Sequence, residues 1–85
     1  MSETKSSPFS ARACLAHNVR RVRLARGWSQ GLLAETSGLH LNTVGALERG
    51  LLNASVDVIE KLALALEVPF IELFQEGNSK HTDSD

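Results

Sequence analysis

The sequence predicts a small all-α domain of five short helices, and three observations indicate this fold class. Apolar residues recur every three or four positions in several segments, which is the spacing of one helix face. Serine or proline precedes most of these segments and glycine follows most of them, as is typical of helix starts and ends. No segment alternates apolar and polar residues in the manner of a half-buried strand.

The first helix is expected to begin after Ser10, which can cap it, and to run to about Arg26. Gly27 then suits a helix C-terminus. Residues 1–9 before the helix are polar and are expected to form a flexible arm. The inward positions, at i, i+4 and i+7, hold Leu15, Val19 and Val22.

The next two helices are expected over residues 30–37 and 41–49, with Gly38 in the turn between them and Gly50 after the second. Ser29 can cap the first of them, and Trp28 can pack on Leu33 as a hydrophobic staple. Leu32, Leu33 and Ala34 are expected to form the apolar face of the first of them, and Val44 and Leu47 to point inward from the second. Two short helices joined by a glycine turn form a helix-turn-helix, whose second helix can enter a DNA major groove.

A fourth helix is expected from the cap Ser55 to about Leu66, and a short fifth helix from Pro69 to about Gln75. The polar residues 77–85 are expected to be a disordered tail, so that residues 10–76 form one domain. The inward positions of the fourth helix hold Val56, Ile59, Leu62, Ala63 and Leu66.

Composition bounds the class of protein. A chain of 85 residues can bury only one small core, which dimerisation would stabilise. The single cysteine, Cys14, forms no internal disulfide and fits a reducing compartment, so we expect a cytoplasmic protein. No apolar run reaches about 18 residues and the N-terminus lacks a basic-then-apolar signal, so we expect neither a membrane span nor a secretion signal.

Charge is divided unevenly along the chain, although the net charge is only −1. Residues 1–49 hold seven basic and three acidic residues, a balance of +4, whereas residues 50–85 hold two basic and seven acidic residues, a balance of −5. A domain with this bipolar charge can present a positive face to phosphate. The alternative is a solvated surface with a chance asymmetry.

An ordered set of residues runs from about Leu15 to Phe74 through the predicted helices. The set consists of Arg23, Ser29, Gln30, Leu33, Ala34, Gly38, Val44, the run Leu47-Glu48-Arg49-Gly50, Asn53, Ser55, Ile59, Leu62, Ala63, Leu66, Val68, Leu73 and Phe74. In this order and without a gap, the set resembles the Xre family of helix-turn-helix proteins, also called Cro/C1-type or lambda-repressor-like. The resemblance implies a compact five-helix lambda-repressor-like domain that regulates transcription by binding double-stranded DNA.

The resemblance implies phosphate contacts near the two ends of the helix-turn-helix. Gln30 lies at a helix N-terminus, where free backbone amides and the helix dipole also favour an anion. Arg49, just past the second helix, is expected to clamp a phosphate, and Asn53 can bond either backbone or phosphate. The full set of expected phosphate contacts is Ser29, Gln30, Arg49, Asn53 and Arg21.

The resemblance also implies an ion pair between Glu48 and an arginine of the first helix, here Arg23. A bidentate pair of this kind would lock the second helix of the motif against the first helix of the domain. We expect its role to be structural positioning.

Base reading is expected from the outward face of the helix over residues 41–49. Asn42 can bond adenine through both ends of its amide, and Leu41 and Ala46 can contact a thymine methyl group. Because this face lacks arginine and lysine, it favours A·T pairs over guanine. Gly45, in the middle of the helix, destabilises the helix by about 0.5–1 kcal/mol relative to alanine. Its presence is explained equally well by close approach to DNA or a neighbouring helix and by mere tolerance of glycine at this position. The expected base contacts are His40, Leu41, Asn42, Thr43 and Ala46.

Relatives of this kind bind two-fold operators as dimers, with recognition helices about 34 Å apart. The fourth and fifth helices carry more apolar residues than one small core needs, which indicates an association surface. For Phe70 and Phe74 the alternative is that they close the core. The expected dimer interface is Val58, Leu64, Phe70, Ile71 and Phe74.

The favoured function is therefore a homodimeric transcriptional regulator of operator DNA. Two alternatives stay open: an antitoxin that neutralises a protein toxin, and a protein-interaction module that has lost DNA binding. Catalysis has little support, because the chain shows no nucleophile–base motif and no phosphate-binding glycine loop. Cys14 and His17 supply only two of the ligands that a zinc site needs. We expect no enzymatic activity, metal or cofactor.

Overall fold

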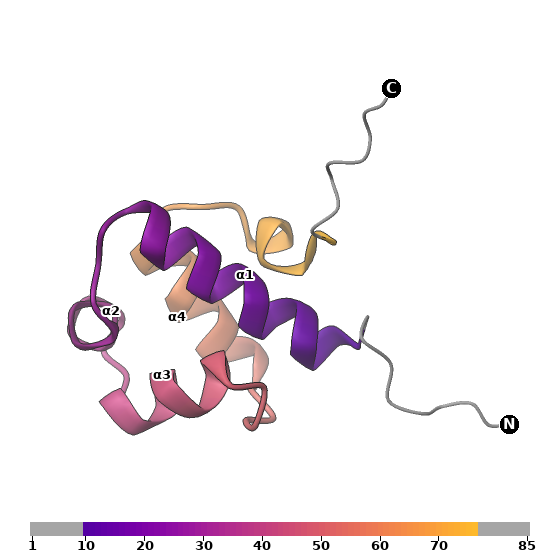
Figure 1. Ribbon diagram of the computed structural model, residues 1–85, viewed down its shortest axis with the longest axis horizontal. Coiled ribbons are helices and arrows are strands. Elements are labelled where there is room, and N and C mark those ends of the chain that lie inside the picture. Colours follow the sequence, from indigo (N-terminus) through magenta and orange to yellow (C-terminus); the bar gives the residue numbers. More distant parts are fainter. Residues whose placement is uncertain (1–9, 77–85) are drawn as a thin grey trace, which may run out of the picture.

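The structure is a computed structural model that describes residues 10–76. In chain order the elements are α1 (Ala11–Ala25), α2 (Gln30–Ser37), α3 (Leu41–Glu48), α4 (Val56–Leu66) and a 3₁₀ helix, η1 (Phe70–Phe74). In Figure 1, α3 lies below α1 and η1 lies above α1. α2 lies at the left, beside the N-terminal end of α3. The predicted arm (1–9) and tail (77–85) lie outside the described residues.

The all-α class is confirmed for this range, which contains helices and no strand, but the helix count differs from the prediction. Four of the expected helices are α-helices, and the fifth segment is a five-residue 3₁₀ helix. Pro69 and Gln75 are both extended, so the segment between them is too short for more than one α-helical turn. The tighter i→i+3 bonds close it instead, as between the Glu72 amide and the Pro69 carbonyl at 2.9 Å.

Three serines cap the helices that the sequence assigned to them. The hydroxyl oxygens of Ser10, Ser29 and Ser55 each accept a hydrogen bond from the backbone amide three residues on, at 3.0–3.1 Å. Gly38 then ends α2 in the left-handed conformation, with φ at 77°. These caps explain why the boundaries of α1, α2 and α4 follow from the sequence.

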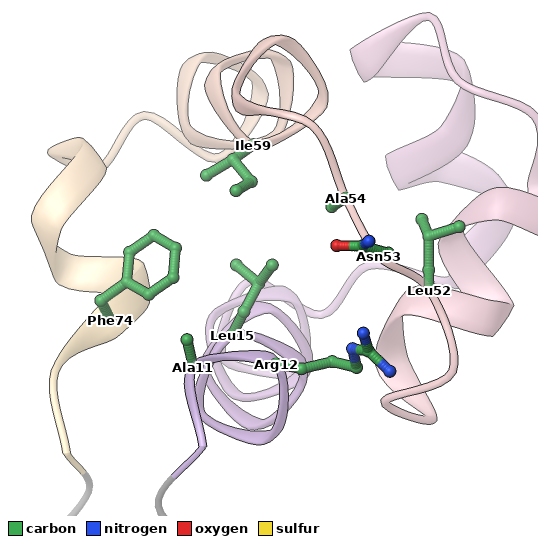
Figure 2. A pocket seen from close by; sticks show the side chains of 8 residues that line it. All are labelled: Ala11, Arg12, Leu15, Leu52, Asn53, Ala54, Ile59 and Phe74. Carbon is green, nitrogen blue, oxygen red and sulfur yellow. The ribbon is translucent and has the colours of Figure 1, made fainter. Parts of the chain in front are cut away.

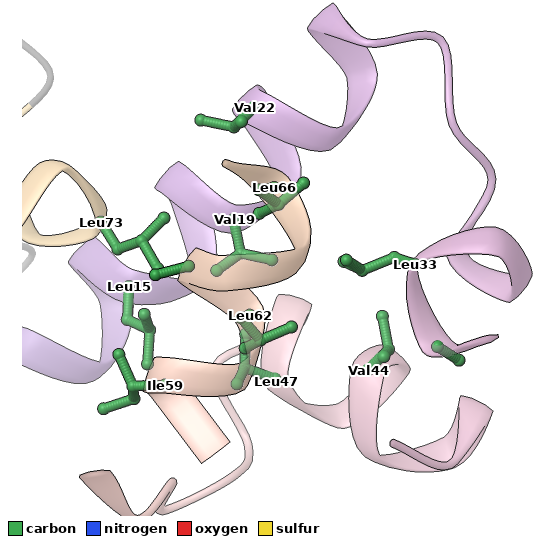
Figure 3. Packing of buried hydrophobic residues seen from close by; sticks show 12 residues of the cluster. Leu15, Val19, Val22, Leu33, Val44, Leu47, Ile59, Leu62, Leu66 and Leu73 are labelled. Carbon is green, nitrogen blue, oxygen red and sulfur yellow. The ribbon is translucent and has the colours of Figure 1, made fainter. Parts of the chain in front are cut away.

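The core lies where the four α-helices and η1 meet, and Figure 3 shows their apolar side chains converging there. The predicted inward stripes of α1 and α3 are buried, as is most of the predicted stripe of α4. Two predicted positions are wrong. Val56 is 67% exposed because it is the first residue of α4 and lies beyond the core, and Leu32 is 40% exposed because it is one step around the helix from Leu33.

Asn18 is a buried polar residue of α1 that sequence reasoning did not single out. Its amide nitrogen donates to the carbonyl oxygens of Leu73 at 3.0 Å and Gln75 at 2.7 Å. The Cys14 thiol also donates to the Gln75 carbonyl, and burial raises the pKa of that thiol, which keeps it protonated. These contacts hold η1 against α1 and satisfy the buried Leu73 carbonyl.

Candidate nucleic-acid interface

α2, the Gly38 turn and α3 form the helix-turn-helix. After the turn, the Leu39 amide donates to the Ala34 carbonyl at 3.0 Å, which fixes the direction in which the chain enters α3. α3 then buries Val44 and Leu47 in the core. Since these residues define the inner face, the opposite face of α3 is left to solvent.

The five predicted base contacts differ in exposure. His40, Leu41 and Asn42 are exposed at the N-terminal end of α3, whereas Thr43 and Ala46 are half-buried. His40 is the N-cap residue, and its side chain makes no capping hydrogen bond. The side chains most open to a ligand are therefore clustered in the first turn of α3.

A buried ion pair joins α1 to α3. The Nε of Arg23 donates to Glu48 Oε2 at 2.6 Å, and Nη2 donates to Oε1 at 2.9 Å, so the pair is bidentate. The two side chains are only 8% and 3% exposed. Arg23 Nη1 also donates to the Trp28 carbonyl at 2.7 Å. The hydrogen bonds from Arg23 to Glu48 raise the pKa of the arginine, which stays charged.

Gln30 extends this pair to the start of α2. Its Nε2 donates to Glu48 Oε1 at 3.0 Å, so Glu48 receives hydrogen bonds from both α1 and α2. The sequence indicated Gln30 only as a phosphate contact and gave no signal for this second partner. We call Arg23, Glu48 and Gln30 the triad. It fixes the C-terminal end of α3 relative to the two other helices.

Two further predicted phosphate contacts are exposed near the end of α3. Arg49 is the C-cap residue of α3, and Asn53 lies in the loop between α3 and α4. Figure 2 shows that Arg12 of α1 extends toward this loop, where it lines a hollow with Leu52 and Asn53. Arg12 thus adds a cationic side chain to the same side of the molecule.

Arg21, the remaining predicted phosphate contact, lies toward η1. Its guanidinium donates to Asn18 Oδ1 at 3.3–3.4 Å and lies 3.9 Å from Glu72 of η1. Arg26 likewise lies 3.6 Å from Glu67, at the end of α4. Arg21 and Arg26 therefore face acidic residues from the second half of the chain, which reduces the positive charge that these two side chains offer to a ligand.

The comparisons with known proteins place this arrangement in a family. The family model HTH_3, described as helix-turn-helix, matches residues 19–73, which include all of α2, α3 and α4. The chain belongs to the HTH_3 helix-turn-helix family. This is the Xre/Cro-C1-like group that the sequence motifs indicated.

Individual proteins resemble the chain in sequence and in structure. A Neisseria hypothetical transcription factor from Neisseria meningitidis is 45% identical over 62 residues, which are 73% of this chain and 58% of that protein. The chain therefore spans less than two thirds of that relative. The crystal structure of the hypothetical transcription factor NHTF from Neisseria has a TM-score of 0.79 and 36% identity, covering 91% of this chain and 88% of that one.

A second solved structure is the restriction-modification controller protein C.AhdI from Aeromonas hydrophila. It has a TM-score of 0.72 and 43% identity, over 74% of this chain and 96% of that one. The HTH_3 fold of the chain thus matches a structure that consists of little more than the domain itself.

The predicted dimer residues of this HTH_3 domain fall into two groups. Leu64, Phe70 and Ile71 are exposed, with Leu64 at 72%, whereas Val58 and Phe74 pack against the core. The exposed Val56 lies close to Leu64 and Phe70, and the three line one shallow hollow with Glu60, Ala63 and Val68. We call Val56, Leu64 and Phe70 the apolar patch.

Within residues 10–76, no three His, Cys, Asp or Glu side chains lie together in a way that would hold a metal ion. None of the helices in this range combines the length and the apolar character needed to span a bilayer.

Proposed function

We propose that the chain is a sequence-specific DNA-binding transcriptional regulator that inserts α3 into the major groove. The observation that carries this proposal is the triad. It anchors α3 by a buried ion pair at 2.6 Å and a further hydrogen bond, while the first turn of α3 stays open to solvent. A reading helix must be held rigidly in this way for its side chains to discriminate between base pairs.

Base recognition is assigned mainly to Asn42 and Leu41. The Asn42 amide can donate to N7 and accept from N6 of adenine, and Leu41 can pack on a thymine methyl group. His40, Thr43 and Ala46 border these two residues and complete the contact surface. Since no arginine or lysine lies among them, we expect a site rich in A·T pairs where α3 touches the bases.

Phosphate binding is assigned to residues that flank α3. The hydroxyl of Ser29 accepts from the Leu32 amide, which leaves its own proton free to donate to phosphate. Gln30 uses one amide proton on Glu48 and has a second one to offer. Arg49 and Asn53 lie beyond the other end of α3. Together these side chains can bind the two walls of the groove around the reading helix.

Arg49→Ala is expected to weaken binding to all DNA sequences by a similar factor. Each cation that neutralises a phosphate contributes about 0.9 to the slope of log K against log salt concentration. The slope should therefore fall by about one in a salt titration followed by fluorescence anisotropy. Arg21→Ala is the matched control, and its slope should equal that of the wild type because Arg21 faces η1. An unchanged slope for Arg49→Ala would remove Arg49 from the phosphate contacts.

We also propose that the regulator is a homodimer joined through the apolar patch. An exposed valine, leucine and phenylalanine that line one hollow form an apolar surface on a chain of 9.2 kDa, and a second copy would bury it. A two-fold dimer would also present two copies of α3 to a palindromic site.

Leu64→Glu is expected to convert the dimer to a monomer, because it places a charge in a surface that must lose its water. Sedimentation analysis should change from twice 9.2 kDa to 9.2 kDa, with helical content unchanged because Leu64 is exposed. Leu24→Glu replaces an exposed leucine of α1 outside the patch, and this variant should remain a dimer. A Leu64→Glu protein that stays dimeric would place the interface elsewhere.

A more specific role as a restriction–modification controller is favoured by one observation. The likeness to C.AhdI covers 96% of that controller at 43% identity. Mapping of the bound sites in the source genome tests this role. Sites upstream of a restriction endonuclease or methyltransferase gene would support it, and sites found only beside unrelated genes would contradict it.

A further inference from the structure

Gly45 is an unexplained glycine at the centre of α3. It occupies the fifth position of an eight-residue helix and is buried. Its backbone is helical and φ is not positive, so the conformation does not require glycine. A glycine here weakens the helix relative to alanine. The backbone conformation therefore does not account for the glycine, and the neighbours of its missing side chain are the remaining structural feature.

The space beside Gly45 is occupied by side chains from both ends of the helix-turn-helix. A Cβ atom at this position would lie 3.3 Å from Nη1 of Arg49 and 3.8 Å from Oε1 of Gln30. Residues 45 and 49 are one turn apart on the same helix face. The Arg49 guanidinium thus folds back along α3 and lies over Gly45, beside the triad.

We propose that Gly45 is a positioning residue for DNA binding, whose missing side chain makes the space that holds the Arg49 guanidinium against α3 next to Gln30. The inference rests on the proposed function in so far as Arg49 contacts phosphate. An arginine side chain that is free in solution loses rotamer entropy when it binds. Held over Gly45, the guanidinium is ordered before DNA arrives, and the cation lies close to a reading face that carries none of its own.

Gly45→Ala and Gly45→Val should displace the Arg49 guanidinium by a small and a larger distance, respectively. In Gly45→Ala the Cβ forces the guanidinium tip to move by a few tenths of an ångström, while the helix gains propensity, so the Tm should rise by roughly 2–8 °C. In Gly45→Val the additional methyl groups extend this close contact and displace the Arg49 guanidinium from α3. Affinity for the selected duplex should fall slightly for alanine and roughly tenfold for valine, as for Arg49→Ala.

The double variants Gly45→Ala/Arg49→Ala and Gly45→Val/Arg49→Ala separate positioning from direct contact. In the Arg49→Ala background Gly45→Ala should not lower the affinity further, and Gly45→Val should lower it by much less than roughly tenfold, because the displaced guanidinium is gone. The salt slope of Gly45→Val should also fall by about one. If Gly45→Val kept full affinity and the full salt slope, the proposal would be overturned, because position 45 would merely tolerate glycine. If the Gly45 substitutions caused equal losses with and without Arg49, it would also be overturned, because DNA would then approach Gly45 directly.

A measurement without DNA tests the geometry by itself. In the free protein, nuclear Overhauser contacts are expected between the Gly45 α-protons and the Arg49 side chain, and Gly45→Val should abolish contacts from that position to the guanidinium. Their absence in the wild type would overturn the positioning role. If the contacts are present but the wild type binds no DNA, the proposed function fails while the packing of Arg49 on Gly45 stands.

Discussion

Glu48→Ala is expected to destabilise the domain by about 3–5 kcal/mol, because it leaves the Arg23 guanidinium charged and buried without its partner. Arg23 is 94% buried as a residue and cannot release its proton near neutral pH. The loss is a large share of the 5–15 kcal/mol that stabilises a typical domain. Thermal unfolding followed by circular dichroism should show a Tm lower by at least roughly 12 °C.

Two controls define the cause of this loss. Glu35→Ala removes an exposed glutamate of α2 and should change stability by no more than about 0.5 kcal/mol. The double variant Arg23→Met/Glu48→Met removes both charges and should recover much of the loss, although the Trp28 carbonyl then lacks its donor. A Glu48→Ala protein within about 1 kcal/mol of the wild type would show that the pair behaves like a surface salt bridge.

Asn42→Ala is expected to weaken binding to the preferred duplex by about 1–3 kcal/mol, or roughly 5- to 150-fold. The amide is the one group in the first turn of α3 that can bond both N6 and N7 of adenine. Because Asn42 is exposed, the Tm of the free protein should not change. Competition binding with the preferred duplex and with duplexes substituted at single positions measures the effect.

The pattern of loss distinguishes base reading from phosphate contact. Asn42→Ala should lose affinity for the preferred duplex and keep its affinity for random DNA. The preference for one base should therefore relax only at the base pair that Asn42 contacts. Asn53→Ala, the matched asparagine assigned to phosphate, should weaken both kinds of binding equally. If Asn42→Ala weakened random DNA to the same extent, Asn42 would belong with the phosphate contacts.

Local signals explain why much of the fold was predictable. Ser10, Ser29 and Ser55 cap helices through bonds that depend only on neighbours in the chain, and Gly38 ends α2 for a similar reason. Helical periodicity then identified most of the buried positions. It failed at Val56, because periodicity gives the direction of a side chain but not how far the core extends along the helix.

The candidate site was less predictable, because its geometry depends on how separate helices pack. The Arg23–Glu48 pairing came from the resemblance to a family and not from spacing. The hydrogen bond from Gln30 to Glu48 joins residues 18 positions apart and has no local signature. Arg21 bonds Asn18, one turn away on α1, and also faces Glu72, which meets it only after η1 folds back onto α1.

Selection of bound duplexes from a randomised DNA pool, at near-physiological salt, tests the central claim most directly. The account predicts enrichment of an inverted repeat with half-sites about one helical turn apart, and with A·T pairs where Asn42 and Leu41 meet the bases. A folded protein that enriches no sequence would contradict the assignment of α3 as a reading helix.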